Sequence, residues 1–168
     1  MPSALVRTLT PKEFKDRWRT PPEVFARAAG RYGPFDLDAA ATLDDRLCSA
    51  WFGPESPLGE DALAVSWGIA EDGVTRAWCN PPYSKNGAFV AKAAEEAEAG
   101  RAQTTLLLPA TTDVRWWHRH VWQDTTQRPG VLVEFLSPRV RFLRPDGSAS
   151  GSPNFGSVLV TFLARGSR

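Results

Sequence analysis

The chain has 168 residues, a length that suits one domain of ordinary size. Hydrophobic residues make up 42% of the sequence and charged residues 23%, a composition typical of a folded globular domain and unlike that of a disordered chain. The formal net charge is only +1, so the chain lacks the overall basic field that marks many nucleic-acid-binding proteins.

Glycine and proline divide the chain into short segments, as expected where strands and helices alternate. Pro21-Pro22 suits the first turn of a helix, and Gly100 suits the end of one. The predicted helices are residues 21–31, 87–99 and 114–122. The predicted strands are residues 35–41, 74–79, 104–108, 131–136, 140–143 and 157–163.

This element order predicts an α/β fold. Early strands separated by helices favour a mostly parallel central sheet with helices on both faces, and the closely spaced late strands favour an antiparallel C-terminal edge. We expect residues 1–168 to form a single domain, with residues 1–17 as a partly ordered N-terminal arm. Ligands of such sheets bind beyond the carboxyl ends of the strands, where the loops after Leu37, Cys79 and Leu108 are predicted to lie.

The charges are unevenly distributed along the chain. Residues 1–31 and 111–168 each carry a balance of +4, whereas residues 32–110 carry −7. An acidic middle suits a cationic small molecule, and arginine-rich flanks suit phosphates. Ordinary solvated faces would give the same pattern, so the distribution alone does not decide between these interpretations.

Cysteine content and hydropathy limit the setting of the protein. Two cysteines, Cys48 and Cys79, are too few for a disulfide framework or a cysteine-rich metal site. No apolar run of about 18 residues is present, and residues 1–10 lack the apolar stretch of a signal peptide. We therefore expect a cytoplasmic protein with reduced thiols, without a metal or a membrane partner.

The tetrapeptide Asn80-Pro81-Pro82-Tyr83 has specific physical properties. A residue before proline is held out of the helical region, and each proline ring fixes its own φ. The carboxamide of Asn80 and the carbonyl of Pro81 are therefore two acceptors on a stiff loop, followed by an aromatic ring. Such a loop can hold an amino group attached to a flat ring, although Asn and Pro also occur in plain turns.

The two acceptors suit transfer of an alkyl group to an exocyclic amine such as adenine N6. The lone pair of this nitrogen is delocalised into the ring, which makes it a poor nucleophile. Two fixed acceptors on its hydrogens would favour a more pyramidal nitrogen and stabilise the positive charge that develops during attack. The alkylated nitrogen loses its proton readily, so Asn can serve where a strong base is not needed.

These residues resemble a known family. Asn-Pro-Pro-Tyr after a strand is similar to the catalytic motif of amino-methyltransferases that use S-adenosylmethionine, and further segments narrow the resemblance to phage-type DNA N6-adenine methyltransferases. These segments are residues 18–25 (Trp-Arg-Thr-Pro-Pro-Glu-Val-Phe), residues 33–41 (Gly-Pro-Phe-Asp-Leu-Asp-Ala-Ala-Ala), Asp61-Ala62-Leu63 with Trp67, residues 78–84, and Leu107-Leu108-Pro109 with Thr112-Asp113 and Trp117-His118. The resemblance covers residues 18–163 and implies a Rossmann-like methyltransferase fold.

The resemblance assigns roles to individual residues. Asn80 and Pro81 would contact the adenine amino group, Pro82 would be a rigid spacer, and Tyr83 would stack on the target base. The residues implied to bind the cofactor, S-adenosylmethionine, are Trp18, Thr20, Pro21, Asp36, Asp38, Ala39, Ala40 and Asp61. Asp61 would accept from the amine of the cofactor's adenine, and Thr20-Pro21 would hold its amino-acid end. For Trp18 and Phe35, packing in the core is the competing interpretation.

Two features of the first strand leave alternatives open. Asp36 and Asp38 are expected on the same face, and Asp38 is favoured as the cofactor ligand because it is nearer the loop. Most related enzymes have a glycine-rich turn here, where this chain has Asp38-Ala39-Ala40-Ala41. Because alanine limits close approach of the backbone, the cofactor must lie differently or the turn must be wider.

DNA is the implied partner, and its target base must leave the helix to reach a recessed pocket. The candidates for phosphate contacts are Arg115, Arg119, Arg139, Arg141 and Arg144, with solubility as the competing interpretation. Only 41 residues separate Asp38 from Asn80, which leaves no room for an inserted recognition domain, so we expect short or relaxed sequence specificity. The alternative functions are methylation of cytosine N4, an RNA base or a protein glutamine, and nucleic-acid binding without catalysis.

Overall fold

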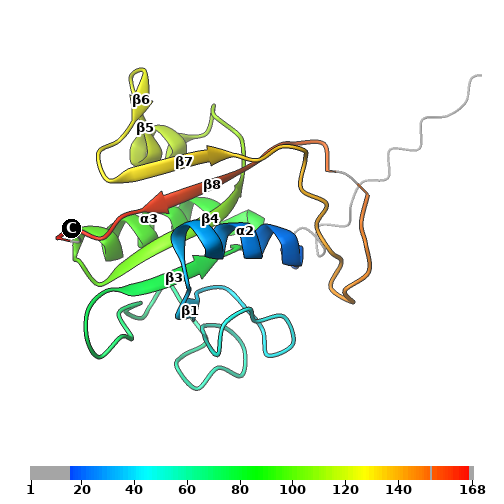
Figure 1. Cartoon of the computed structure of the whole chain (residues 1–168), viewed down its shortest axis with the longest axis horizontal. Coiled ribbons are helices and arrows are strands. Elements are labelled where there is room, and N and C mark those ends of the chain that lie inside the picture. The colour runs from blue at the N-terminus through cyan, green and yellow to red at the C-terminus, as the bar shows by residue number, and fades with distance from the viewer. Residues whose placement is uncertain (1–15, 152, 167–168) are drawn as a thin grey trace, which may run out of the picture.

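The computed structural model describes residues 16–151 and 153–166, so residues 1–15 of the expected N-terminal arm lie outside the described residues. Within this part of the chain, a six-stranded sheet has the order β2-β1-β3-β4-β8-β7 (Figure 1). Its strands are β1 (Leu37–Asp38), β2 (Ala50–Trp51), β3 (Thr75–Cys79), β4 (Ala102–Pro109), β7 (Val131–Phe135) and β8 (Ser157–Phe162). A short hairpin of β5 (Trp122–Gln123) and β6 (Thr126–Gln127) stands apart from this sheet.

The strand directions confirm a mostly parallel sheet with an antiparallel C-terminal edge. Strands β2, β1, β3 and β4 are parallel, with Leu37 opposite both Ala50 and Ala77. Strand β8 is antiparallel to β4 and also to β7, which forms the outer edge. The C-terminal strand therefore lies one position inside the edge.

The two long helices cover opposite faces of the sheet (Figure 1). Helix α2 (Pro22–Tyr32) packs its buried Ala28 in one core cluster with Trp78 and Leu107. Helix α3 (Asn86–Glu98) packs its apolar face in another cluster, which contains Leu106 and Leu108. Because neighbouring residues of a strand point to opposite faces, this division confirms that helices lie on both faces.

Three predicted elements differ in the structure. The strand predicted over residues 35–41 is only the two residues of β1, Leu37–Asp38, followed by a loop. Residues 140–143 are no strand of the sheet; they belong to the long β7–β8 loop, which comprises residues 136–151 and 153–156. Val140 and Phe142 are buried and Arg141 is exposed, so this segment has a strand's alternation while its apolar side packs beside α2. The alternation of apolar and polar residues predicts which side of an extended segment is buried. It does not predict which other segment its main chain pairs with.

The predicted helix over residues 114–122 is shorter than expected. Only a turn of π-helix, η2 (Trp117–Val121), with a helical turn just before it, is formed. The next residue, Trp122, begins the β5–β6 hairpin, in which it pairs with Gln127. Its ring stacks on Trp117 at an interplanar angle of 18°, so aromatic packing places it in the hairpin.

Candidate active site

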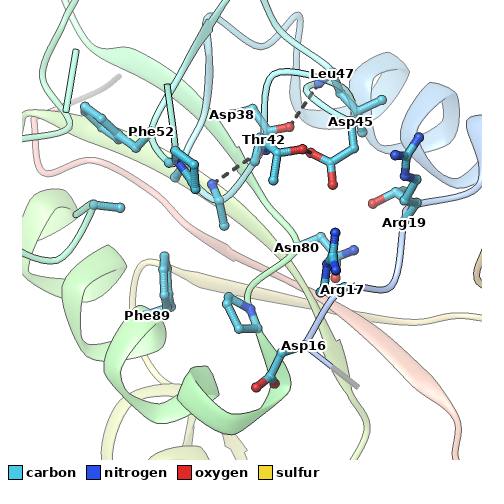
Figure 2. Close-up of a pocket in the computed structure, with 18 of the residues that line it drawn as sticks. Asp16, Arg17, Arg19, Asp38, Thr42, Asp45, Leu47, Phe52, Asn80 and Phe89 are labelled. Atoms are coloured by element: carbon cyan, nitrogen blue, oxygen red, sulfur yellow. Dashed lines mark hydrogen bonds between the residues drawn. The ribbon is translucent and has the colours of Figure 1, made fainter. Parts of the chain in front are cut away.

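A cavity of about 520 Å³ opens beyond the carboxyl ends of β1 and β3, a size that suits a small organic ligand. Five parts of the chain line it: residues 16–20, the end of β1 with the loop that follows, residues 52–63, the segment from the end of β3 into α3, and Pro145 between β7 and β8. Figure 2 shows Asp38, Thr42 and Asp45 on one side, Arg17 and Asn80 on another, and Phe52 and Phe89 across from them. The parallel sheet brings these segments together because the carboxyl ends of its strands meet at one edge.

Asp38 is the buried acidic group of this cavity. Its side chain is 3% exposed, and its carboxylate accepts hydrogen bonds from the backbone N–H of Leu47 (3.0 Å) and of Ala40 (3.3 Å) (Figure 2). Burial raises the pKa of Asp38 to about 7, although these two hydrogen bonds act in the opposite direction. A cation bound in the cavity would restore the charged form, so the site favours a positively charged ligand.

Asn80 presents an unpartnered oxygen at the cavity. Its Nδ2 donates to the backbone carbonyl of Trp18 (3.0 Å). Because only the NH₂ group can donate to a carbonyl, this bond fixes which way the amide is turned. Its Oδ1 is buried and has no hydrogen-bond partner among the described residues. Such a group normally has one, so Oδ1 is an acceptor without a partner, on a side chain that lines the cavity.

The rest of the tetrapeptide is held firmly. Pro81 is buried, and the carbonyl of Pro82 accepts from the N–H of Lys85 (2.8 Å) in the short 3₁₀ helix η1 (Tyr83–Lys85). The Tyr83 ring packs nearly perpendicular to Phe142 and at 70° to Phe155. Burial raises the pKa of the Tyr83 hydroxyl, so it stays neutral over the physiological range. Pro81 and Tyr83 are not among the residues that line the cavity.

The structure brings together most of the residues assigned to cofactor binding. Those that line the cavity are Trp18, Thr20, Asp38, Ala39, Ala40 and Asp61. Pro21 and Asp36 do not line it. The exposed carboxylate of Asp36, just before β1, accepts from the N–H of Arg76 (2.8 Å), and of these two acidic residues it is Asp38 that lines the cavity.

The segment after β1 is a long irregular connection and not a tight turn. Residues 39–49 form an irregular loop, held in part by Asp45, whose carboxylate accepts from the N–H and hydroxyl of Thr42 (2.6 and 3.0 Å). The close approach of backbone occurs later, at Gly53, where an added Cβ would lie 1.8 Å from the carbonyl oxygen of Ala41. The glycine that this site needs is thus on the segment after β2, where no sequence motif marked it.

Several lining residues were missed by the sequence analysis. They include Asp16, Arg17, Thr42, Asp45, Phe52, Lys85, Phe89 and Pro145. Asp45 accepts from Thr42 in the turn after β1, and this turn also places it at the cavity. For Pro145, which comes from the β7–β8 loop, no local signal exists, since its position depends on the course of a long connection.

The candidate arginines fall on two elements. Arg139, Arg141 and Arg144 are exposed on the β7–β8 loop, which extends beyond the carboxyl ends of the strands (Figure 1). Arg115 and Arg119 are exposed at η2. Arg139 and Arg141 do share a side of an extended segment, although that segment belongs to a loop and not to the sheet. Arg19, beside the cavity, pairs with the same loop through Leu143 (2.9 and 3.0 Å).

Metal and membrane features are judged on residues 16–151 and 153–166. Within these ranges, no group of three or more His, Cys, Asp or Glu side chains is arranged to hold a metal ion. In the same ranges, every helix is too short or too polar to cross a bilayer.

The arrangement of the sheet defines the class of protein: a Rossmann-like methyltransferase fold. The crystal structure of the 23S rRNA methyltransferase ErmE superposes with a TM-score of 0.50 over 89% of this chain and 70% of that one, at 16% sequence identity. A likeness at this identity supports the fold and carries no information on the substrate.

Sequence comparison then identifies the family. The model of the DNA N-6-adenine-methyltransferase (Dam) family matches residues 7–165, so the chain belongs to this family. A DNA N-6-adenine-methyltransferase of Escherichia phage T1 is 39% identical over 162 residues, which are 90% of this chain and 64% of the relative. Another, from Haemophilus phage HP1, is 26% identical over 94% of this chain and 84% of the relative.

The chain therefore spans less than two thirds of the length of the phage T1 relative. The family and the fold imply a methyl donor of the S-adenosylmethionine type. The residues present fit such a donor, because the cavity has the volume for it, a buried carboxylate for its cationic groups and apolar walls at Phe52 and Phe89.

Proposed function

We propose that this protein methylates the N6 amino group of adenine in DNA, with S-adenosylmethionine as donor and the target base flipped out of the helix. The observation that carries this proposal is the Oδ1 atom of Asn80, which is buried at the cavity without a partner among the described residues. A target amino group is the kind of donor that this oxygen lacks.

S-adenosylmethionine supplies an electrophilic methyl group on a sulfonium. Asp38 is the group that would hold a cationic or hydroxyl part of this donor, since its carboxylate is buried at the cavity. Thr20 and Trp18 would form the wall at the amino-acid end, and Ala39 and Ala40 would pack beneath the donor. Asp61, one of whose oxygens already accepts from the N–H of Leu63 (3.0 Å), would use the other for the adenine amine of the donor.

The loop from Asn80 to Tyr83 would act on the target adenine. Asn80 Oδ1 and the carbonyl of Pro81 would accept the two N6 hydrogens, which concentrates the lone pair on the nitrogen and orients it toward the methyl group. As the N–C bond forms and the C–S bond breaks, positive charge develops on N6, and both oxygens stabilise it. The proton then passes to solvent, so no basic side chain is required.

Tyr83 and the arginines would serve the DNA. Stacking on an aromatic ring contributes about 1–3 kcal/mol per base, which offsets part of the stacking that a flipped adenine loses. Phe142 and Phe155 hold the Tyr83 ring edge-on, so it is ordered before the base arrives. Arg139, Arg141 and Arg144 on the β7–β8 loop, with Arg115 and Arg119, would contact phosphates on either side of the target.

Identification of the product tests this proposal. The protein is incubated with S-adenosylmethionine labelled in the methyl group and unmethylated DNA, and the DNA is digested to nucleosides. The label is expected in N6-methyl-2′-deoxyadenosine. Label in N4-methylcytosine would show that the target amine is that of cytosine. If RNA or protein is offered in parallel and is labelled while DNA is not, the target amine lies in that other substrate. DNA binding without any label transfer would favour a non-catalytic module.

A further inference from the structure

Residues 16–20 run beside the loop that carries Asn80, and Asp16 is attached to that loop directly. One oxygen of the Asp16 carboxylate accepts from the backbone N–H of Ser84 (2.8 Å), and the other accepts from the Ser84 hydroxyl (2.7 Å). Ser84 lies in η1, immediately after Asn80-Pro81-Pro82-Tyr83. A single carboxylate therefore holds the end of the tetrapeptide at two points.

The same segment holds the beginning of the tetrapeptide. The carbonyl of Trp18 accepts from Asn80 Nδ2 (3.0 Å), and Arg19 pairs in both directions with Leu143 of the β7–β8 loop (2.9 and 3.0 Å). Residues 16–20 thus connect to both ends of the tetrapeptide and are themselves fixed from the other side. No bond from Asp16 to another part of the cavity wall is found among the described residues.

Because the tetrapeptide is stiff, its attachment at Ser84 affects the position of Asn80. Pro81 and Pro82 have fixed φ angles, so a displacement at Ser84 is passed along the loop and is not absorbed within it. Hydrogen bonds to a carboxylate are stronger than neutral ones, and here two share one acceptor group. In enzymes, a misplacement of about 1 Å can reduce the rate on the order of a hundredfold.

We infer that Asp16 is a positioning residue for methyl transfer, acting through Ser84 to hold the Asn80 carboxamide in place at the cavity. This inference rests on the proposed function. Asp16 lines the cavity, but both of its carboxylate oxygens accept from Ser84, so its effect is expected through the loop and not through contact with the amine or the methyl group. Its removal should therefore lower the rate of transfer and leave the binding of the donor nearly unchanged.

The test is Asp16→Ala, with Asp16→Asn as the conservative variant and Glu71→Ala as the matched control. Glu71 is an exposed carboxylate in the loop before β3, away from the cavity. We expect Asp16→Ala to reduce kcat about ten- to a hundredfold while the Kd for S-adenosylmethionine changes less than about twofold. Asp16→Asn keeps one acceptor for the Ser84 N–H and should recover part of kcat. Glu71→Ala should behave as the parent.

A double-mutant cycle with Ser84→Ala tests the route of the effect. If Asp16 acts through Ser84, the variant that lacks both side chains should be no slower than Asp16→Ala alone. Fully additive losses, or a Kd for the donor that rises as much as kcat falls, would overturn the inference. Equal kcat values for Asp16→Ala and Glu71→Ala would do the same.

An NMR readout separates this inference from the proposed function. In Asp16→Ala, the backbone amide of Ser84 should exchange faster with solvent, and the side-chain amide resonances of Asn80 should shift. If the parent protein methylates no adenine, the proposed function fails, and the spectra still report on the loop. Asn80 resonances that stay unchanged in Asp16→Ala would overturn the positioning role regardless of activity.

Discussion

The two ends of the Asn80 carboxamide have different environments. The NH₂ group donates to the Trp18 carbonyl, and the oxygen is buried at the cavity without a described partner. An unsatisfied buried oxygen costs about 1–3 kcal/mol, a cost that a bound amine would remove. The sequence could predict that this residue type presents an acceptor. It could not predict how the amide is turned, because the Trp18 carbonyl lies 62 residues away along the chain.

The raised pKa of Asp38 predicts how donor binding depends on pH. Its carboxyl group titrates at about 7, so below this pH it is protonated and must lose its proton before a cation binds. The Kd for S-adenosylmethionine should therefore rise about tenfold for each unit by which the pH is lowered from 7 to 5.5. The α-amino group of the donor stays protonated over this range, so its own charge does not change. Calorimetry over this range provides the measurement.

Asp38→Asn is the control for this pH dependence. The variant has no charge at this position, so it should bind the donor more weakly at pH 7 and with little change down to pH 5.5. If Asp38→Asn showed the same slope as the parent, another group would be responsible, and Asp38 would not be the ligand of the cation.

At the scale of elements, the β7–β8 loop differs most from expectation. Its central residues alternate as a strand does, and the sequence predicted a strand there. In the structure both main-chain sides of β8 are taken by β4 and β7, and of the loop residues Leu143 pairs instead with Arg19 and Ala149. The inner side of the loop packs against Tyr83, and its outer side carries three arginines. This division of sides suits an element between the loop that carries Asn80 and DNA.

The loop arginines should account for part of the affinity for DNA. Replacing Arg139 and Arg141 together by Ala removes two positive charges, so the protein should bind a DNA duplex more weakly. The slope of log K against log salt concentration should also become less steep, by about 1–2. The matched control is Arg165→Ala. Arg165 is an exposed residue that follows β8 and forms an ion pair with Glu98. Fluorescence anisotropy at several salt concentrations gives the slopes. Equal slopes for both variants would exclude these two arginines from the interface.

Helix α3 depends on a buried charge. Glu96 is fully buried, and its carboxylate pairs with Lys92 (2.8 Å) and Arg101 (2.7 Å) and accepts from the N–H of Trp67 (3.2 Å). Burial alone would raise the pKa of Glu96, but these partners outweigh it and lower the pKa to about 2. The lowered pKa stabilises the fold above pH 4.5, and the stabilisation is lost as the pH falls toward 2.

Glu96→Gln should lower the free energy of unfolding by about 3 kcal/mol at pH 7, because the partners lose a buried charge. The difference from the parent should shrink as the pH falls below 4.5. Urea denaturation at several pH values measures both effects. Glu98→Gln removes an exposed ion pair on the same helix and should cost less than about 1 kcal/mol. A similar cost for both variants would contradict the role given to Glu96.

At the scale of the whole molecule, the order of the strands decides where the site forms. Asp38 pairs in register with Trp78, so Asn80 follows only two residues beyond this pair on the neighbouring strand. The sequence predicted this meeting, because both residues end apolar segments of parallel strands. It predicted neither the short β2 nor the course of residues 16–20, since these depend on contacts between distant parts of the chain.

The distribution of charge also takes on meaning in three dimensions. The acidic middle of the sequence supplies Asp38, Asp45 and Asp61 to the cavity lining, the basic N-terminal flank supplies Arg17 and Arg19, and the basic C-terminal flank carries the exposed arginines of the β7–β8 loop. A cationic donor inside and a polyanion outside would each meet charges of the opposite sign. The small net charge of the chain conceals this separation.

The rate of a single turnover by Asn80→Ala tests the central claim most directly. With donor saturating and enzyme in excess over adenine-containing DNA, methyl transfer should be about a hundredfold or more slower than in the parent, since the acceptor of the N6 hydrogens is gone. Calorimetry should find the affinity for S-adenosylmethionine within about twofold of the parent value. A variant that transfers methyl groups as fast as the parent would show that this oxygen takes no part in the reaction.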